Sequence, residues 1–284
     1  MPKLFPTSSR MLLATALIVA LSALSGCLAF HPGALPHEPR KTSFGPAQFK
    51  TVLGTRVHYI DVGEGPPVVL IHGFASSLNA WKGLVTALEK NHRVIALDLK
   101  GFGWTDRPEG DYSPKAQGKL VFGLLDSLGV DHASLVAHSW GSSVALQMAL
   151  DAPARIDRIA LYDAWVYEEQ LPTFFLWARA DGIGEALFSM FYDERADDKM
   201  ALAFYDKNNV TEALVESVEE QLDRPGTTAA ALAAVRGQHY GEAQKRYGTI
   251  DKPVLLLWGR EDKVTTLDYG ERLSKDRPRA KLIV

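Results

Sequence analysis

The arrangement best suited to chemistry is a serine between a predicted strand and a predicted helix. Residues 133–137 form a short apolar run typical of a buried strand, and residues 143–150 carry small and straight-chain side chains that favour a helix. A chain that passes from strand to helix across Ser139 must turn sharply, which lifts the hydroxyl above the sheet. Such a turn needs small residues on both sides, here Ala137 and Gly141. We therefore expect Ser139 to be a nucleophile, the alternative being a serine that only ends a strand.

Three further motifs stand in a fixed order around this turn. His72-Gly73-Phe74 follows an apolar run at 67–71, which is typical of a central strand covered on both faces. A loop at 98–108 reads D-L-K-G-F-G-W-T-D-R-P, and the apolar run 253–258 ends in G-R-E-D at 259–262. Together with A-x-S-x-G they resemble the α/β-hydrolase family over residues 52–284. The departures are small, since Ala137 stands for the usual glycine and Thr105 for the usual serine.

The resemblance implies a role for each motif. The backbone N–H groups of Phe74 and Trp140 would form an oxyanion hole, and Asp262 would orient the catalytic histidine, with Glu261 as the fallback. A supporting loop would be built from His72, Gly73 and Gly141. For His72 the structural interpretation is favoured over proton transfer. No metal or organic cofactor is implied, and no Cys/His cluster has ligand spacing.

The histidine that activates the serine is harder to assign. A serine hydroxyl is a poor nucleophile until a base takes its proton, and in the family this base follows the last strand, which we expect to begin at residues 281–284. We therefore expect the base beyond Val284 and a nearly inactive chain without it. Of the histidines present, His138 adjoins the serine but its ring should turn away from the hydroxyl. His239 is the remaining alternative.

Strand and helix patterns alternate along much of the chain, which predicts an α/β fold with a doubly wound, mostly parallel sheet. Antiparallel strands open it at 44–61. Residues 165–245 change to aromatic-rich helical segments, where the family inserts a cap. We expect the α/β-hydrolase core at 44–164 and 246–284, the helical cap at 165–245, and a last strand and helix that continue past Val284.

The first 43 residues are expected to be a signal peptide followed by a tether. Lys3 and Arg10 precede an apolar run at 11–24, and the following Leu-Ser-Gly-Cys resembles the lipobox of bacterial lipoprotein signal peptides. This predicts a signal peptide at 1–26, lipidation of Cys27, a tether at 27–43 and an exported lipoprotein anchored in a membrane of the bacterial cell envelope. An uncleaved membrane helix over 11–30 is the alternative.

Composition limits the class of protein. The 284-residue chain is 46% hydrophobic, carries a formal net charge of −3 and has no basic cluster, so a nucleic-acid surface is not expected. The cap aromatics predict an uncharged, apolar acyl substrate. We expect a serine esterase or lipase-like hydrolase; a C–C bond hydrolase, a cofactor-free perhydrolase or a non-catalytic ligand-binding module remain open. The oligomeric state is not predicted.

Overall fold

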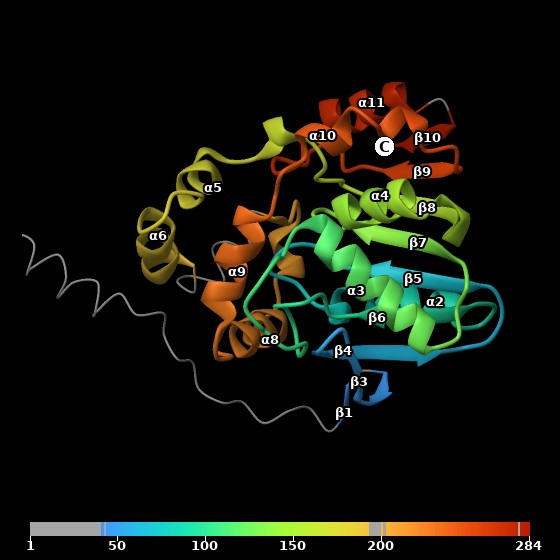
Figure 1. Cartoon of the computed structure of the whole chain (residues 1–284), viewed down its shortest axis with the longest axis horizontal. Helices are drawn as coiled ribbons and strands as arrows, with labels where there is room; N and C mark the ends of the chain where they lie inside the picture. Colours follow the sequence, from blue (N-terminus) through green and yellow to red (C-terminus); the bar gives the residue numbers. More distant parts are fainter. Residues whose placement is uncertain (1–40, 43, 193–199, 201–202, 278) are drawn as a thin grey trace, which may run out of the picture.

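An eight-stranded sheet forms the centre of the protein in the computed structural model, which describes residues 41–42, 44–192, 200, 203–277 and 279–284 (Figure 1). The strand order is β10-β9-β8-β7-β5-β6-β4-β3. Neighbours from β6 to β10 pair in parallel, whereas β4 pairs antiparallel with both β3 and β6. The strands are β3 (Gln48–Val52), β4 (Thr55–Val62), β5 (Pro67–Ile71), β6 (Arg93–Leu97), β7 (Ala133–His138), β8 (Ile156–Tyr162), β9 (Val254–Leu257) and β10 (Ala280–Ile283). The predicted fold class is confirmed.

Helices cover both faces of this sheet, and the side-chain alternation of β5 shows why. Val69 and Ile71 belong to the core built with α3 (Pro114–Ser127) and α4 (Gly141–Asp151). Val68 and Leu70, which point the other way, belong to the core built with η1 (Leu78–Trp81) and α2 (Lys82–Leu88). A strand buried on both faces is apolar throughout, which is the pattern that the sequence showed at 67–71.

The ends of α3 follow local rules that the sequence already displays. The Ser113 hydroxyl accepts a hydrogen bond from the Ala116 N–H at 3.2 Å, and Pro114 occupies the first helical position. Gly129 follows the helix with a φ of 69°. By contrast, the hairpin of β1 (Lys41–Thr42) and β2 (Gly45–Pro46) was not expected.

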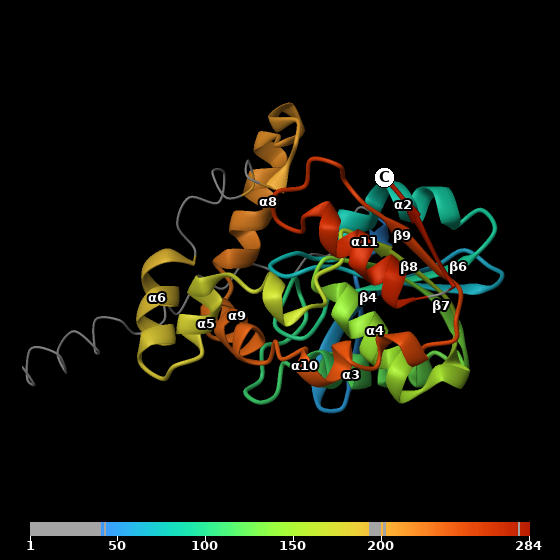
Figure 2. The ribbon, with the colours of Figure 1, turned by 90° about the horizontal axis from the view of Figure 1, so that it is seen from above.

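Between β8 and β9 the described residues form helices and no strand. These are η3 (Glu168–Gln170), α5 (Thr173–Ala178), α6 (Ile183–Phe191), η4 (Lys207–Asn209), α8 (Glu212–Leu222), α9 (Thr227–Arg236), α10 (Gly241–Gln244) and η5 (Tyr247–Thr249). In Figures 1 and 2, α5, α6, α8 and α9 lie beyond the carboxyl ends of the parallel strands. The chain then enters β9 and α11 (Leu267–Asp276). The helical content of this region is as expected; the domain boundaries stay predictions.

The predicted signal peptide and the predicted lipidation site, Cys27, lie outside the described residues. Among the residues that the structure does describe, no helix is long and apolar enough to cross a membrane. That same part of the chain contains no cluster of His, Cys, Asp and Glu fit to hold a metal ion.

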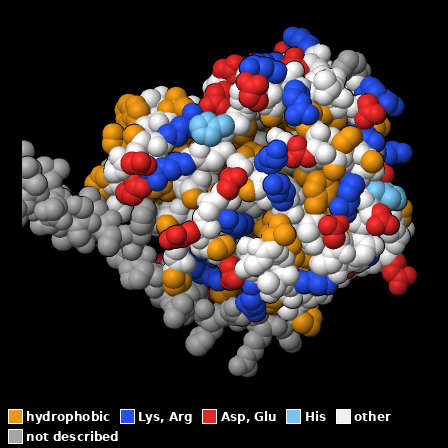
Figure 3. Space-filling view, in the orientation of Figure 1, with side chains coloured by type: hydrophobic (Ala, Val, Ile, Leu, Met, Phe, Trp, Pro, Cys, Tyr) orange, Lys and Arg blue, Asp and Glu red, His pale blue; other side chains and the backbone are white. Residues whose placement is uncertain are grey.

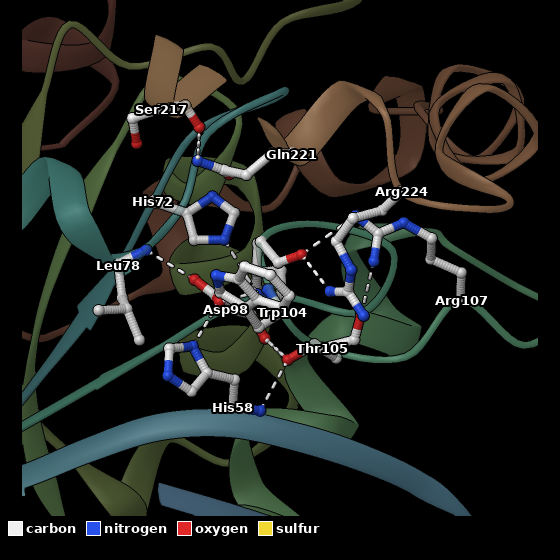
Figure 4. A network of polar contacts seen from close by, with 12 residues as sticks. His58, His72, Leu78, Asp98, Trp104, Thr105, Arg107, Ser217, Gln221 and Arg224 are labelled. Atoms are coloured by element: carbon white, nitrogen blue, oxygen red, sulfur yellow. Dashed lines mark hydrogen bonds and ion pairs between the residues drawn. The ribbon is translucent and has the colours of Figure 1, made fainter. Parts of the chain in front are cut away.

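A buried carboxylate, Asp98, fixes the loops above the sheet (Figure 4). One carboxylate oxygen accepts the Leu78 N–H at 2.7 Å. The other accepts the Trp104 N–H at 2.7 Å and pairs with His58 Nδ1 at 2.7 Å. Asp98 thereby ties together strand β4, the loop that follows β5 and its own loop after β6.

The loop after β6 has no room for a side chain at Gly103. A Cβ atom on Gly103, whose φ is 48°, would lie 2.1 Å from the Asp98 carboxylate. The Thr105 hydroxyl donates to the Asp98 carbonyl at 2.6 Å and accepts the His58 N–H at 2.9 Å. Threonine therefore supplies the hydroxyl at the position where the family usually has serine.

Burial raises the pKa of Asp98. The hydrogen bond and charge of His58 lower this pKa by more, so that the net shift is downward. A carboxylate with a lowered pKa in the folded state stabilises that state above its unfolded pKa, near pH 4. This contribution is lost as the pH falls through the folded pKa.

We expect Asp98→Asn to lower the free energy of unfolding by about 3–5 kcal/mol at pH 7, because an amide NH2 in place of a carboxylate oxygen leaves buried hydrogen-bond donors without an acceptor. Urea denaturation followed by circular dichroism measures the loss. Asp126→Asn is the matched control, since Asp126 pairs with Arg155 at 2.6 Å but its side chain is 62% exposed; its loss should stay below about 1 kcal/mol. Equal small losses in both variants would contradict the role given to Asp98.

Candidate active site

Ser139 occupies the turn between β7 and α4 with a φ of 49°, in the left-handed region. A non-glycine residue there costs about 1–3 kcal/mol and persists only where its surroundings hold it. Its N–H donates to the Tyr162 carbonyl at 3.0 Å, and its carbonyl accepts the Trp165 N–H at 3.1 Å. The side chain is partly exposed. The predicted strand–serine–helix turn is therefore present, and the hydroxyl is not in the core.

The turn rests directly on the end of β5. A Cβ atom on Gly141 would lie 2.4 Å from the His72 carbonyl oxygen and 2.6 Å from that of Ile71. From the other side, a Cβ atom on Gly73 would come within 3.1 Å of Ser139 Cβ. Two glycines thus allow the first turn of α4 and the loop after β5 to meet at the serine.

His72 holds this loop and has no nitrogen left for proton transfer. Its Nδ1 lies 2.7 Å from the Gly73 carbonyl, and its Nε2 accepts the Leu99 N–H at 2.9 Å. Burial lowers the pKa of His72, which keeps the ring neutral in this tautomer. The geometry supports the structural interpretation.

Two backbone N–H groups at the serine turn have no acceptor among the described residues, those of Phe74 and Trp140. Trp140 is the N-cap residue of α4, where the first amides of a helix are unsatisfied and the helix dipole is positive. Phe74 lies on the loop that Gly73 brings against Ser139. These are the two N–H groups to which the resemblance assigns the oxyanion hole, and that role stays a prediction.

Asp262 lies in the loop after β9, and its carboxylate is oriented by its own loop. Oδ1 accepts the N–H groups of Val264 at 2.7 Å and Thr265 at 2.9 Å, and Oδ2 accepts the Thr265 hydroxyl at 2.8 Å. The carboxylate is half-buried, whereas the neighbouring Glu261 is exposed. The structure therefore favours Asp262 over Glu261 as the ordered acid of this loop.

A second carboxylate, Asp163, was missed by the sequence analysis. It directly follows β8 with a φ of 43°, and its Oδ1 accepts the Gly259 N–H at 2.8 Å. Burial raises the pKa of Asp163, the hydrogen bond from Gly259 opposes this, and the charge of Asp262 raises it again. The sequence could have indicated Asp163, because it directly follows a predicted strand and the carboxyl ends of neighbouring parallel strands share one edge of the sheet.

The described histidines differ in what they can reach. His58 pairs with Asp98, and His132 pairs with Asp157 near the start of β7, the end opposite to Ser139. His239 is exposed and interacts with Glu168. His138 lies against Gly73, and its charge interacts with Asp262. None of these side chains has a hydrogen bond to Ser139 or Asp262 in the part of the chain that the structure describes.

Aromatic rings of the cap meet those of the core above the turn. Phe175 and Tyr192 lie 5.5 Å and 6.3 Å from the ring of Phe74, and Phe102 lies 5.5 Å from Trp140, measured between ring centroids. Phe174 and Phe188 stack on each other within the cap at 5.6 Å. Three further aromatic residues of this region, Trp177, Phe204 and Tyr205, are exposed. A cavity of about 10 Å³ is lined in part by Phe102, Arg107 and Tyr192.

We expect Gly141→Ala to lower the free energy of unfolding by about 1–3 kcal/mol, because its methyl group collides with two backbone carbonyls that cannot swing aside. Gly83→Ala is the matched control: a Cβ atom there meets nothing within 4 Å, and alanine in a helix stabilises by up to about 1 kcal/mol. Urea denaturation of both variants measures the difference. An unchanged stability in Gly141→Ala would show that the turn does not lie against β5.

We expect Asp262→Asn to lower the pKa of His138 further. Desolvation of the ring lowers this pKa although part of the residue is exposed, and the negative charge of Asp262 partly raises it. Removing that charge disfavours the protonated ring. An NMR titration of the imidazole resonances measures the shift. Glu261→Gln, one residue away and exposed, should leave the pKa of His138 almost unchanged. The same shift of the His138 pKa in both variants would mean that Asp262 lies no closer to His138 than Glu261 does.

Comparison with known proteins agrees with this geometry. Residues 66–204 match the family model described as the alpha/beta hydrolase fold. The chain is 30% identical to a variant of a meta-cleavage product hydrolase, covering 83% of this chain and 88% of that one with a TM-score of 0.68. It is 29% identical to the 2-hydroxy-6-oxo-2,4-heptadienoate hydrolase of Pseudomonas putida, over 78% of this chain and 81% of that one. The enol-lactonase of Burkholderia xenovorans LB400 shares the fold at 22% identity, over 83% and 90% of the two chains, with a TM-score of 0.69. The chain belongs to the α/β-hydrolase family.

Proposed function

We propose that this α/β-hydrolase is a serine hydrolase that cleaves a carboxylic ester or similar acyl bond through an acyl-enzyme. The observation that carries the proposal is the left-handed turn at Ser139, which hydrogen bonds hold on both sides. The N–H groups of the adjacent Trp140 and of Phe74, on the loop that Gly73 brings against Ser139, have no acceptor among the described residues. Backbone strain of this kind is costly and concentrates at functional sites. A serine that merely ended a strand would need neither the strain nor the two free donors.

In the proposed reaction the Ser139 hydroxyl attacks the substrate carbonyl while a histidine takes its proton. The N–H groups of Phe74 and Trp140 stabilise the negative charge that develops on the carbonyl oxygen. Asp262 orients the histidine, which we place after Val284 from the order of the motifs. The same histidine returns the proton to the leaving group, and water then hydrolyses the acyl-enzyme.

The substrate is proposed to be apolar around its acyl group. The rings of Phe74, Phe102, Phe175 and Trp165 surround the serine turn and are contributed by both core and cap. An apolar acyl chain placed among them would lose water-exposed surface without leaving a polar group unpaired. Because the described cavity is small, we propose that the cap moves away from the core to admit the substrate.

We expect a fluorophosphonate probe to label Ser139 of the protein that carries the proposed histidine, and Ser139→Ala to abolish labelling. Ser142→Ala is the control, because Ser142 is a buried serine of the same helix whose hydroxyl has no partner among the described residues. The chain ending at Val284 should react far more slowly, since loss of the base from such a triad costs on the order of 10⁶ in kcat. Mass spectrometry locates the label. Absence of labelling in all forms would favour a ligand-binding module.

A C–C bond hydrolase is the second candidate, and the relatives favour it. A meta-cleavage product hydrolase and a 2-hydroxy-6-oxo-2,4-heptadienoate hydrolase are similar to this chain over more than three quarters of its length. The reaction would use the same serine and the same oxyanion donors, with a carbon leaving group in place of an alcohol. The two candidates differ in the bond broken and not in the residues proposed here.

We expect kcat/KM for short apolar p-nitrophenyl esters to exceed that for a 2-hydroxy-6-oxo-dienoate by at least tenfold if the esterase proposal holds. Release of p-nitrophenol and loss of the dienoate absorbance measure the two rates on one preparation. Ser139→Ala serves as the blank for both. The reverse preference would replace the esterase by the C–C bond hydrolase while leaving the proposed triad in place.

A second proposal concerns the location of the protein in the cell. We propose that the protein is exported and that Cys27 carries a lipid anchor in a membrane of the cell envelope. The support is the sequence alone, a positive segment followed by an apolar run and Leu-Ser-Gly-Cys.

A further inference from the structure

Two cap helices present an apolar face to solvent, which we call the outer cap face. It consists of Leu176 and Trp177 of α5 and Ile183 and Met190 of α6, whose exposed fractions are 44%, 61%, 53% and 42%. Figures 1 and 2 both show α5 and α6 side by side at the edge of the molecule farthest from β10, and Figure 3 shows hydrophobic side chains gathered there. Large apolar side chains are rarely clustered in water without a partner.

The orientation of the two helices follows from how they pack on each other. Phe174 and Phe188 stack between them, and a Cβ atom on Gly184 would lie 2.2 Å from the Ala178 carbonyl oxygen. These inward positions fix the rotation of each helix. Ile183 and Met190, seven residues apart, then share the outward side of α6.

One cation and two carboxylates lie beside the outer cap face. Arg236 lies 2.7 Å from a carboxylate oxygen of Glu185 and 3.4 Å from one of Asp181. Hydrogen bonding and charge from Arg236 lower the pKa of Glu185, which stays ionised in the pair. This group of three charges is net negative, so burial of the apolar side chains, and not attraction between charges, would drive contact with another surface.

The sequence of the first 27 residues points to a lipid bilayer as the partner of the outer cap face. Residues 11–24 are apolar, and Cys27 is the proposed lipidation site. Thirteen residues lie between Cys27 and Lys41, the first described residue; even a fully extended chain from Cys27 to Lys41 spans only about 50 Å. An anchor at Cys27 would hold the folded part within about one domain diameter of the bilayer.

We propose that the outer cap face docks on a lipid bilayer. Leu176, Ile183 and Met190 enter the boundary between headgroups and acyl chains, and the indole of Trp177 lies at headgroup depth, where tryptophan is enriched. Docking places the cap helices that cover Ser139 against the phase in which an apolar ester would dissolve. The proposal rests on the proposed lipid anchor at Cys27 and not on the proposed hydrolysis, because it concerns where the cap lies.

Spin labels at single positions test this docking. Leu176→Cys and Met190→Cys are labelled with a nitroxide in the full chain, which is then bound to vesicles of phosphatidylethanolamine and phosphatidylglycerol. Leu53→Cys is the matched control, since Leu53 is 74% exposed at the turn between β3 and β4. We expect vesicles to raise the accessibility of labels 176 and 190 to oxygen relative to a water-soluble nickel chelate by at least threefold, and to leave label 53 unchanged. Unlabelled variants should melt at the wild-type temperature, because all three sites are exposed.

Each other outcome overturns the proposal. Labels 176 and 190 that stay as accessible to the nickel chelate as label 53, on chains that sediment with vesicles, would mean that the anchor holds the protein while the cap faces water. Spin–spin broadening at 176 and 190 without lipid would assign the face to a second copy of the chain. Failure to sediment at all would remove both the docking and the anchor, while fluorophosphonate labelling of Ser139 would still report on the hydrolase.

Discussion

The site depends on a backbone contact between the start of α4 and the end of β5. Strands β5 and β7 are parallel neighbours, so their carboxyl ends meet at one edge of the sheet. Gly141 lets the helix approach the carbonyls of Ile71 and His72, and Gly73 lets the loop approach Ser139. If either were larger, the serine and the two proposed oxyanion donors would move apart. The strained φ of Ser139 is tolerated because this contact leaves it little alternative.

The buried Asp98 holds the loop after β5 that takes part in this contact. It accepts hydrogen bonds from Leu78 of that loop and from Trp104 of its own loop after β6, and it pairs with His58. A buried charge of this kind stabilises little in net terms, since desolvation offsets most of the attraction. Its effect is to exclude other loop conformations, because any of them would leave the carboxylate without partners. We infer that Asp98 fixes where Phe74 lies through the Leu78 end of the same loop.

The cap combines two kinds of apolar surface that serve different purposes. Its inner aromatics, Phe175 and Tyr192, contact Phe74 of the core above the serine turn. Its outer apolar residues are exposed. Burial of the inner set stabilises the packing of the cap on the core, whereas the outer set gains only if a second phase or partner covers it. A cap that bridged a membrane and the serine turn would use both.

The sequence by itself determined what local chemistry decides. The Ser113–Pro114 start of α3 follows from hydrogen bonding within a few residues, and the alternation of strands and helices predicted the parallel sheet. The serine turn was predicted because small residues on both sides of Ser139 are a local requirement. Where side chains far apart in the chain meet, only the tertiary structure decided. His58 and Asp98 are 40 residues apart and Asp163 and Gly259 are 96 apart, and no periodicity records such pairs. The same holds for Trp177, because an aromatic residue in a short helix carries no sign of whether another helix will cover it.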